Sequence, residues 1–330
     1  MDGALDENFR FQNPASRGFY FFTLLLYHGI TVTYTYFDIH SHLNDKRYAD
    51  DLSEVLTRMR EHGVASIVVG TDHEMSERAI ALAEKYDDLW ATIGQHPTDK
   101  HEESFGDAWY LEHAKHPRVV AIGECGLDYY WPEIRSRQRS EKIQGLAFPK
   151  LPLRPDLVFS PDLEISAASD TTQEKHRQHD LFERQIVIAE KVGKPLMVHG
   201  RPTKGTMDAY EDILAILKNH PGIRGNIHFF VGNVDVAKQF LDLGLTMSFT
   251  GVLTFTHDYD EVVKYLPLDR IMSETDAPYV SPTPHRGKRN EPAFVVETVK
   301  AIARIRGEDE GSVRDALVAN AKNAFRLRSF

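Results

Sequence analysis

Polar side chains of the types that bind divalent metal ions stand at the ends of several short apolar segments. These residues are His40, His42, Glu124, His199, His228 and Asp276. His40 and His42 are two residues apart, so on an extended segment their imidazoles point the same way. Neutral imidazoles suit Zn²⁺ or Mn²⁺, and carboxylates suit Mg²⁺ or Mn²⁺. The set therefore predicts a metal site made of histidines and carboxylates.

A site of this composition could activate water. A carboxylate such as Glu124 has two oxygens and could bridge two ions. Two divalent ions with Glu124 and Asp276 would keep a local charge of about +2, which attracts an anion. The chain as a whole carries a net charge of −10. A bound ion lowers the pKa of water to about 7, and a carboxylate such as Asp276 can accept the proton. We therefore expect a metal-dependent hydrolase.

Eight short apolar segments alternate with helical patterns and would position these side chains. The predicted strands are Phe37–His40, Val64–Gly70, Trp90–Gln95, Val119–Glu124, Pro195–His199, Gly225–Phe229, Leu245–Phe249 and Arg270–Asp276. They are rich in Val and Ile, as buried parallel strands are. Eight strand–helix units predict an α/β fold, the TIM (β/α)8 barrel, whose active sites lie at the carboxyl ends of the strands. A doubly wound sheet would want a Gly-x-Gly-x-x-Gly turn, and the sequence has none.

Two segments interrupt this alternation. Residues 1–36 form an N-terminal extension, and its apolar run Phe19–Ile30 is shorter than the roughly 20 residues of a membrane span. After Glu124, the next helical pattern begins only near Thr172. Residues 132–173 are therefore predicted to be an insertion in the fourth strand-to-helix loop, and a solvated loop is favoured over a substrate lid. One TIM-barrel domain is expected over residues 37–330.

Composition excludes several classes of protein. The single cysteine, Cys125, excludes an intramolecular disulfide and a cysteine-based zinc finger. Asp2, Asp6 and Glu7 argue against a signal or transit peptide, so a cytoplasmic location is expected, with the nucleus or an organelle left open. The negative net charge disfavours a protein that wraps or slides along duplex DNA. No feature indicates a membrane span or an obligate protein partner.

Six motifs, in order along the chain, resemble those of the TatD family of metal-dependent deoxyribonucleases. They are Phe37–His42, Ile93–Pro97, Ala121–Tyr130, Val198–Arg201, Ile227–Gly232 and Ser273–Tyr279. The resemblance covers about Phe37 to Arg328 apart from the insertion. It implies a TIM-barrel hydrolase of the amidohydrolase superfamily that cleaves phosphodiesters at DNA ends, commonly in the 3′ to 5′ direction. It also implies two divalent ions, with Mg²⁺ suggested by the family and Zn²⁺ or Mn²⁺ by the histidines.

The same resemblance implies roles for individual residues. One ion would be held by His40, His42, Glu124 and Asp276, and the second by Glu124, His199 and His228, with Glu124 as the bridge. His96 and Arg201 match positions expected near the substrate phosphate. Catalysis would then rest on Asp276, Glu124 and His96, and the substrate would be DNA ends or short single-stranded DNA.

Rival functions share parts of this pattern. A superfamily member acting on an ester or amide, such as an aminoacyl-tRNA deacylase, would have a similar metal site. His96 and Arg201 favour a phosphodiester because they are candidate phosphate contacts. A non-catalytic metal or scaffold protein predicts the loss of at least one ligand, and none is missing. A binder of long single strands would pair a basic groove with aromatic residues, for which Tyr129, Tyr130 and Trp131 are the candidates. The sequence does not determine whether the substrate is DNA or RNA, or whether cleavage occurs at an end or internally. The oligomeric state is also left open.

Overall fold

The barrel is built from eight parallel strands that are hydrogen-bonded in chain order. The computed structural model describes residues 34–99, 105–130 and 162–327, and only the backbone of residues 162–170. The strands are β1 (Tyr36–Ser41), β2 (Val64–Val69), β3 (Leu89–Ile93), β4 (Val119–Asp128), β5 (Leu196–Arg201), β6 (Gly225–Ile227), β7 (Thr246–Phe249) and β8 (Ile271–Ser273). The predicted TIM barrel is confirmed, because every strand pairs in parallel with the next.

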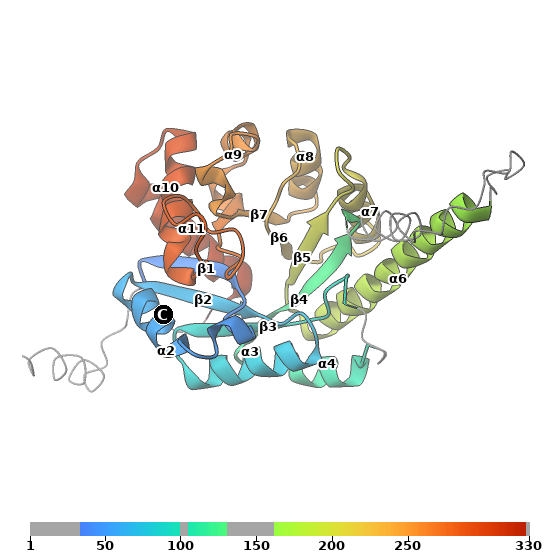
Figure 1. Ribbon diagram of the computed structural model, residues 1–330, viewed down its shortest axis with the longest axis horizontal. Helices are drawn as coiled ribbons and strands as arrows, with labels where there is room; N and C mark the ends of the chain where they lie inside the picture. The colour runs from blue at the N-terminus through green and yellow to red at the C-terminus, as the bar shows by residue number, and fades with distance from the viewer. Residues whose placement is uncertain (1–33, 100–104, 131–161, 328–330) are drawn as a thin grey trace, which may run out of the picture. The chain divides into compact units, whose positions relative to one another are not determined.

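Helices connect the strands and lie outside them (Figure 1). They are α2 (Leu52–Glu61), α3 (His73–Lys85), α4 (Asp107–His113), α6 (Asp162–Val192), α7 (Asp208–Leu217), α8 (Val234–Asp242), α9 (Asp260–Tyr265), α10 (Val295–Arg306) and α11 (Glu310–Phe325). Short 3-10 turns are η2 (Lys46–Tyr48), η3 (Gly251–Thr254), η4 (Leu268–Arg270) and η5 (Pro292–Phe294). Helix α3 packs on β3 and α11 on β1. Of the helices described, none is long and apolar enough to cross a membrane.

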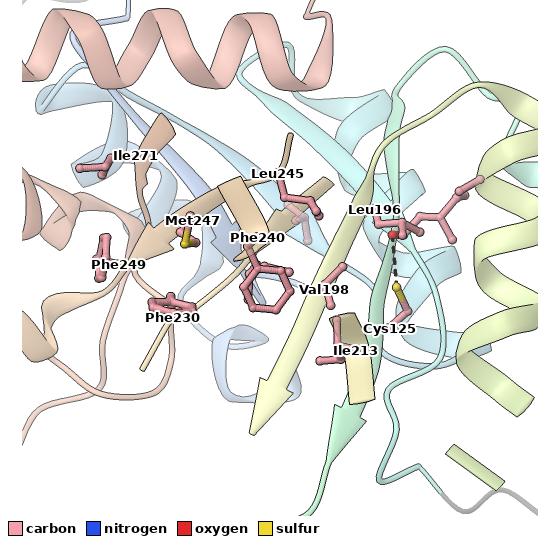
Figure 2. Packing of buried hydrophobic residues seen from close by; sticks show 14 of the residues in the cluster. Cys125, Leu196, Val198, Ile213, Phe230, Phe240, Leu245, Met247, Phe249 and Ile271 are labelled. Carbon is pink, nitrogen blue, oxygen red and sulfur yellow. Dashed lines mark hydrogen bonds between the residues drawn. The ribbon is translucent and has the colours of Figure 1, made fainter. Parts of the chain in front are cut away.

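The apolar core lies between the helices and the sheet. In α2 the buried residues are Val55, Leu56 and Met59, which share one face at helical spacing. Gly63 follows this helix with a φ of 65°, a left-handed conformation that favours glycine. Figure 2 shows another part of the core, around Val198 of β5. This packing leaves the polar ends of the strands at one rim of the barrel.

Two strands extend further toward that rim than the sequence predicts. Strand β4 continues from Glu124 to Asp128, and β5 continues from His199 to Arg201. The two strands remain paired there, with Asp128 opposite Arg201. Glu124 and His199 therefore lie within the wall of the barrel rather than at its edge.

The predicted insertion is too long at its carboxyl end. Helix α6 begins at Asp162, whereas the helical pattern was expected to begin near Thr172. Residues 162–173 are therefore helical rather than part of a loop. Their apolar residues follow the helical period only weakly, which is why the sequence did not predict these first turns. Residues 131–161 and 1–33 lie outside the described residues, so the proposed roles of both segments stay predictions.

Asp38 links the first strand to the segment after the last one. Its carboxylate is completely buried and accepts hydrogen bonds from Thr275 N at 2.9 Å and Thr275 Oγ1 at 2.7 Å. It also accepts one from His40 N at 3.2 Å. Ser273 Oγ donates to Phe37 O across the same gap at 3.2 Å. Side chains thus help to close the barrel between β8 and β1.

Asp38→Ala should lower the free energy of unfolding by about 3 kcal/mol, because it leaves buried donors without acceptors. Asp38→Asn should lower it by about 1 kcal/mol or less. The amide oxygen can still accept from the two backbone N–H groups, and burial already raises the pKa of Asp38 well above its usual value. Urea denaturation of both variants measures the difference. Equal losses would mean that the charge, and not the hydrogen-bond pattern, holds this closure.

Candidate metal centre

Glu124 lies on an irregular part of β4. The pairing of β4 with β5 shifts register around this residue. Two positions on, Gly126 has a φ of 130°, and a Cβ there would lie 2.1 Å from the carbonyl oxygen of His199, so only glycine fits. Glu124 N donates to Gly70 O of the β2 end at 2.8 Å. Irregularities of this kind redirect side chains, and here the carboxylate reaches His40 of β1, His199 of β5 and His228, which directly follows β6.

The first group of potential ligands joins β1 to the loop after β8. Asp276 N donates to His40 O at 2.9 Å, and His42 N donates to Ala277 O at 2.7 Å. The Nε2 atoms of His40 and His42 lie 3.3 Å apart. Asp276 Oδ1 lies 3.8 and 3.4 Å from these two atoms, and Glu124 Oε2 lies 3.4 and 3.8 Å from them. Both carboxylates therefore face the same pair of Nε2 atoms.

The second group uses the other oxygen of Glu124. Its Oε1 lies 2.8 Å from His199 Nδ1 and 2.8 Å from His228 Nε2. Those two nitrogens are 3.2 Å apart. The rings of His40 and His228 stack with centroids 3.9 Å apart, so the two groups are adjacent. The structure thus brings together all six residues that the sequence singled out as ligands.

The spacing of the donor atoms fits divalent cations. Four ligands held at about 2.0–2.1 Å from a zinc ion in a tetrahedron lie about 3.3–3.4 Å from one another. In the first group, the two Nε2 atoms lie 3.3 Å apart and each carboxylate lies 3.4–3.8 Å from them, and the donor atoms of the second group lie 2.8–3.2 Å apart. His42 Nδ1 lies 3.2 Å from the carbonyl oxygen of Val69, so the neutral ring carries its proton there and leaves the Nε2 lone pair directed toward His40 Nε2. A cation bound between the two Nε2 atoms would accept this lone pair.

The charges of the centre also favour a cation. Burial opposes the ionisation of Glu124, but His228 and His96 outweigh it and hold the pKa of Glu124 well below its usual value. Burial also opposes the ionisation of Asp276, but a hydrogen bond from His42 lowers the pKa of Asp276 below its usual value. Burial likewise disfavours a protonated His228, yet Glu124 raises its pKa well above the usual range. A metal ion would displace such protons, so binding should weaken in acid.

A cavity of about 870 Å³ opens onto both groups, and His96 and Arg201 line it. His96 Nε2 lies 3.4 Å from Glu124 Oε1, and burial lowers the pKa of His96. The guanidinium of Arg201 lies 4.0 Å from the centre of the Tyr130 ring. Both residues that were expected near a substrate phosphate therefore border the same cavity as the candidate ligands.

Two carboxylates to which the sequence reasoning assigned no role contact the histidines of the second group. Asp128 Oδ2 lies 3.1 Å from His199 Nε2, and Glu274 Oε2 lies 3.4 Å from His228 Nδ1. Histidines that bind a metal commonly donate their other ring nitrogen to a carboxylate. Both acids stand inside the motifs of the sequence, and that placement was the signal that could have identified them.

Glu274→Gln should weaken the affinity for the second ion by about 10- to 100-fold. Oε1 of Glu274 accepts hydrogen bonds from Phe229 N and Ser248 Oγ, both at 2.6 Å, so a glutamine would keep its carbonyl there. Its amide would then face His228 Nδ1 and move the imidazole proton to Nε2, the nitrogen that faces Glu124. Competition with a chelating dye measures the affinity. Wild-type affinity would show that His228 is oriented without Glu274.

The structure also describes the surroundings of Tyr129 and Cys125. Tyr129 is wrong as a residue for stacking a base, because it is completely buried and its hydroxyl donates to Asp212 Oδ2 at 2.7 Å. Trp131 lies outside the described residues. Cys125 is buried, and burial raises the pKa of its thiol well above the usual value. A buried thiol with a raised pKa stays protonated, so Cys125 is poorly suited to act as a nucleophile.

Comparison with known proteins identifies the family. The sequence model described as TatD related DNase matches residues 37–145 and 165–326. The chain belongs to the TatD family. Within the barrel, the match leaves residues 146–164 uncovered, so the segment that departs from the TatD pattern is shorter than the predicted 132–173. The N-terminal residues 1–36 are also unmatched.

Relatives of this TatD protein span nearly its whole barrel. The uncharacterized metal-dependent hydrolase YabD of Bacillus subtilis (strain 168) is 35% identical over 297 residues, which cover 88% of this chain and 99% of YabD. A 3′-5′ ssDNA/RNA exonuclease TatD of Edwardsiella piscicida is 30% identical over 305 residues, which cover 88% of this chain and 99% of the exonuclease. This TatD protein is therefore a metal-dependent hydrolase.

A solved structure shares the TatD fold. The crystal structure of YjjV, a TatD homologue from Escherichia coli k12, matches with a TM-score of 0.68 and 24% identity. The match covers 90% of this chain and 100% of YjjV. The barrel and its order of elements are thus those of a known TatD homologue.

Proposed function

We propose that this hydrolase is a 3′-5′ exonuclease that removes nucleotides from single-stranded DNA with two divalent ions. The observation that carries the proposal is the position of Glu124, whose two oxygens face two different groups of ligands. Pairs of ions that share a site are typical of nucleases and phosphatases. The similarity to the 3′-5′ ssDNA/RNA exonuclease TatD of Edwardsiella piscicida supports the same class of substrate.

The two ions would be held by the predicted sets of residues. These are His40, His42, Glu124 and Asp276 for one ion, and Glu124, His199 and His228 for the other. When bound, the ions would neutralise charge on a phosphodiester and make a water molecule more acidic. Asp276 is the proposed proton acceptor because it lines the cavity and its side chain is 15% exposed, against 5% for Glu124. The bridging role of Glu124 keeps it out of proton transfer.

His96 would donate a hydrogen bond to a phosphate oxygen. Its Nδ1 accepts a hydrogen bond from Thr98 N at 3.2 Å, so the proton of the neutral ring is on Nε2. Nε2 is the atom that lies near Glu124, at the floor of the cavity. A donor placed there contacts the phosphate whose bond is broken. Arg201 would bind a non-bridging oxygen of the same or the next phosphate.

The proposal is tested with a 3′-labelled single-stranded oligonucleotide of DNA or RNA. Release of labelled mononucleotides that requires Mg²⁺, Mn²⁺ or Zn²⁺ and stops with a chelator is the expected result. An ester, an amide and an aminoacyl-tRNA are assayed in parallel with the same metals. Cleavage of one of these with an untouched oligonucleotide, while metal binding is intact, would transfer the function to that substrate class.

Arg201→Ala should make binding less sensitive to salt. Each phosphate neutralised on a single strand contributes about −0.7 to the slope of log K against log salt, so the variant should lose about that much. KM should rise while metal content stays unchanged, because arginine is not a ligand. The matched control is Arg270→Ala, which lies just before β8 at the opposite rim. Equal changes in the two variants would show a nonspecific effect of net charge.

A further inference from the structure

One aromatic side chain at the rim of the cavity is exposed. Among the residues that the structure describes, the exposed large hydrophobic side chains are Val187, Phe255, Tyr265 and Tyr279. Of these, Tyr279 lines the cavity of the metal centre, with 47% of its surface accessible. An exposed aromatic ring that borders the candidate metal centre is in a position to contact a bound substrate.

The backbone around Tyr279 holds this ring in place. Asp276 and Val280 have φ values of 53° and 46°, in the left-handed region that a β-branched residue such as valine rarely adopts. The completely buried Asn290 donates from Nδ2 to Tyr279 O at 2.6 Å and to Thr275 O at 2.9 Å. Strain of this kind persists only where the surrounding contacts enforce it, and it is common at ligand sites. The ring is therefore preorganised at the rim.

Arg47 and His42 cover part of the Tyr279 ring, and 47% of the residue stays accessible to a planar group. Arg47 lies with its guanidinium carbon 4.3 Å from the ring centre, and Asp45 holds that guanidinium through two hydrogen bonds of 2.9 and 2.7 Å. The edge of the ring approaches His42, with centroids 6.0 Å apart at 80°. A group that stacks on the accessible surface of Tyr279 would thus lie within one nucleotide of the metal ligands.

We propose that Tyr279 is a stacking subsite for an unpaired nucleobase next to the phosphate that is cleaved. The proposal rests on the proposed nuclease function and assigns to Tyr279 the contact with one base of its single-stranded substrate. Stacking on an aromatic ring is tolerant of sequence, because every base has a π face. A base within a duplex is already stacked and paired, so it must leave the helix before it can reach Tyr279. Single strands are then the preferred substrate.

The test combines protein variants with modified strands. Tyr279→Leu removes the π face, and Tyr279→Phe keeps it. The substrates are a single-stranded oligonucleotide and two copies in which an abasic residue replaces the nucleotide on one or the other side of the 3′-terminal phosphodiester. The control variant is Tyr265→Leu, an exposed tyrosine on α9 that does not line the cavity. The readouts are kcat/KM, metal content, and anisotropy with a fluorescent strand whose phosphorothioate linkages resist cleavage.

We expect the effect of the Tyr279 substitution to depend on one base beside the cleaved phosphodiester. Tyr279→Leu should lower kcat/KM on the intact strand by about 5- to 150-fold, the range measured for loss of one stacked base. Tyr265→Leu should behave as wild type, and Tyr279→Phe, which keeps the π face, should lose much less activity than Tyr279→Leu. On one of the two abasic strands, wild type and Tyr279→Leu should become equal. The same pattern should appear in the anisotropy, which does not depend on cleavage.

Other outcomes overturn the inference. An equal loss on intact and abasic strands would mean that the ring acts on the fold of the loop, and no loss on any strand would remove the subsite. Wild-type protein that binds the strand in a Tyr279-dependent manner without cleaving it would contradict the nuclease function alone. Wild-type protein that binds none of the strands would overturn both the stacking subsite and the nuclease function.

Discussion

Glu124→Gln should lower kcat/KM on a single-stranded oligonucleotide by about 10³-fold or more, because ions at such sites supply several kcal/mol of transition-state stabilisation. Both proposed ions should be lost, since each oxygen of Glu124 faces a different group of ligands. The glutamine has nearly the same shape as the glutamate. The change therefore removes one negative charge from the centre of the cluster and little of its packing.

Metal analysis of the purified variant, together with its thermal unfolding midpoint, measures this effect. Glu291→Gln is the matched control, because Glu291 is also largely buried but pairs with Arg58 through a contact of 2.6 Å outside the cavity. Its metal content should equal that of wild type. Two ions bound at full occupancy in Glu124→Gln would refute the bridging role.

Asp276→Asn should lower kcat by about 10²- to 10⁴-fold, the range typical for removal of a general base, with a small change in KM. The amide keeps an oxygen that can face His42 Nε2, which lies 3.4 Å from Asp276 Oδ1. At least the ion of the second group should remain bound, because Asp276 is not part of that group. This retention separates the variant from Glu124→Gln, in which both ions are lost.

Rates under saturating metal, measured beside metal content, distinguish proton transfer from ligation. Asp269→Asn, an exposed carboxylate at the opposite rim of the barrel, is the control and should have wild-type kcat. A kcat that recovers fully as the metal concentration is raised would show that Asp276 only holds an ion. A kcat equal to that of wild type at all metal concentrations would exclude both roles.

The alternation of apolar strands and amphipathic helices was sufficient to predict the barrel. Each of the eight segments forms a strand, because short Val- and Ile-rich runs bounded by Gly or Pro have few other stable arrangements. The boundaries of the helices and strands were the least accurate part of the prediction. Helix α6 begins ten residues before the expected Thr172, and β4 continues four residues past Glu124. Boundaries of this kind depend on tertiary packing, which a single stretch of sequence does not contain.

The aromatic residues show the same limit. Tyr129 and Tyr279 both lie in motifs beside candidate ligands. Tyr129 is completely buried with its hydroxyl bonded to Asp212, whereas Tyr279 is exposed at the cavity. The exposure of Tyr279 at the cavity depends on the positive φ values of Asp276 and Val280 and on the hydrogen bond from Asn290 to Tyr279 O. None of these can be read from residue type.

The sequence by itself determined the fold, the family motifs and the six candidate ligands, because residue type and position relative to a strand are local properties. The family resemblance already implied two sets of ligands that share Glu124, and only the tertiary structure decided which oxygen of Glu124 faces which set. It also decided that Asp128 and Glu274 contact the outer nitrogens of His199 and His228. Each of these contacts joins side chains far apart in the chain. Their distances depend on the closure of the barrel and on the irregularity at Gly126, where a Cβ would meet the backbone of β5.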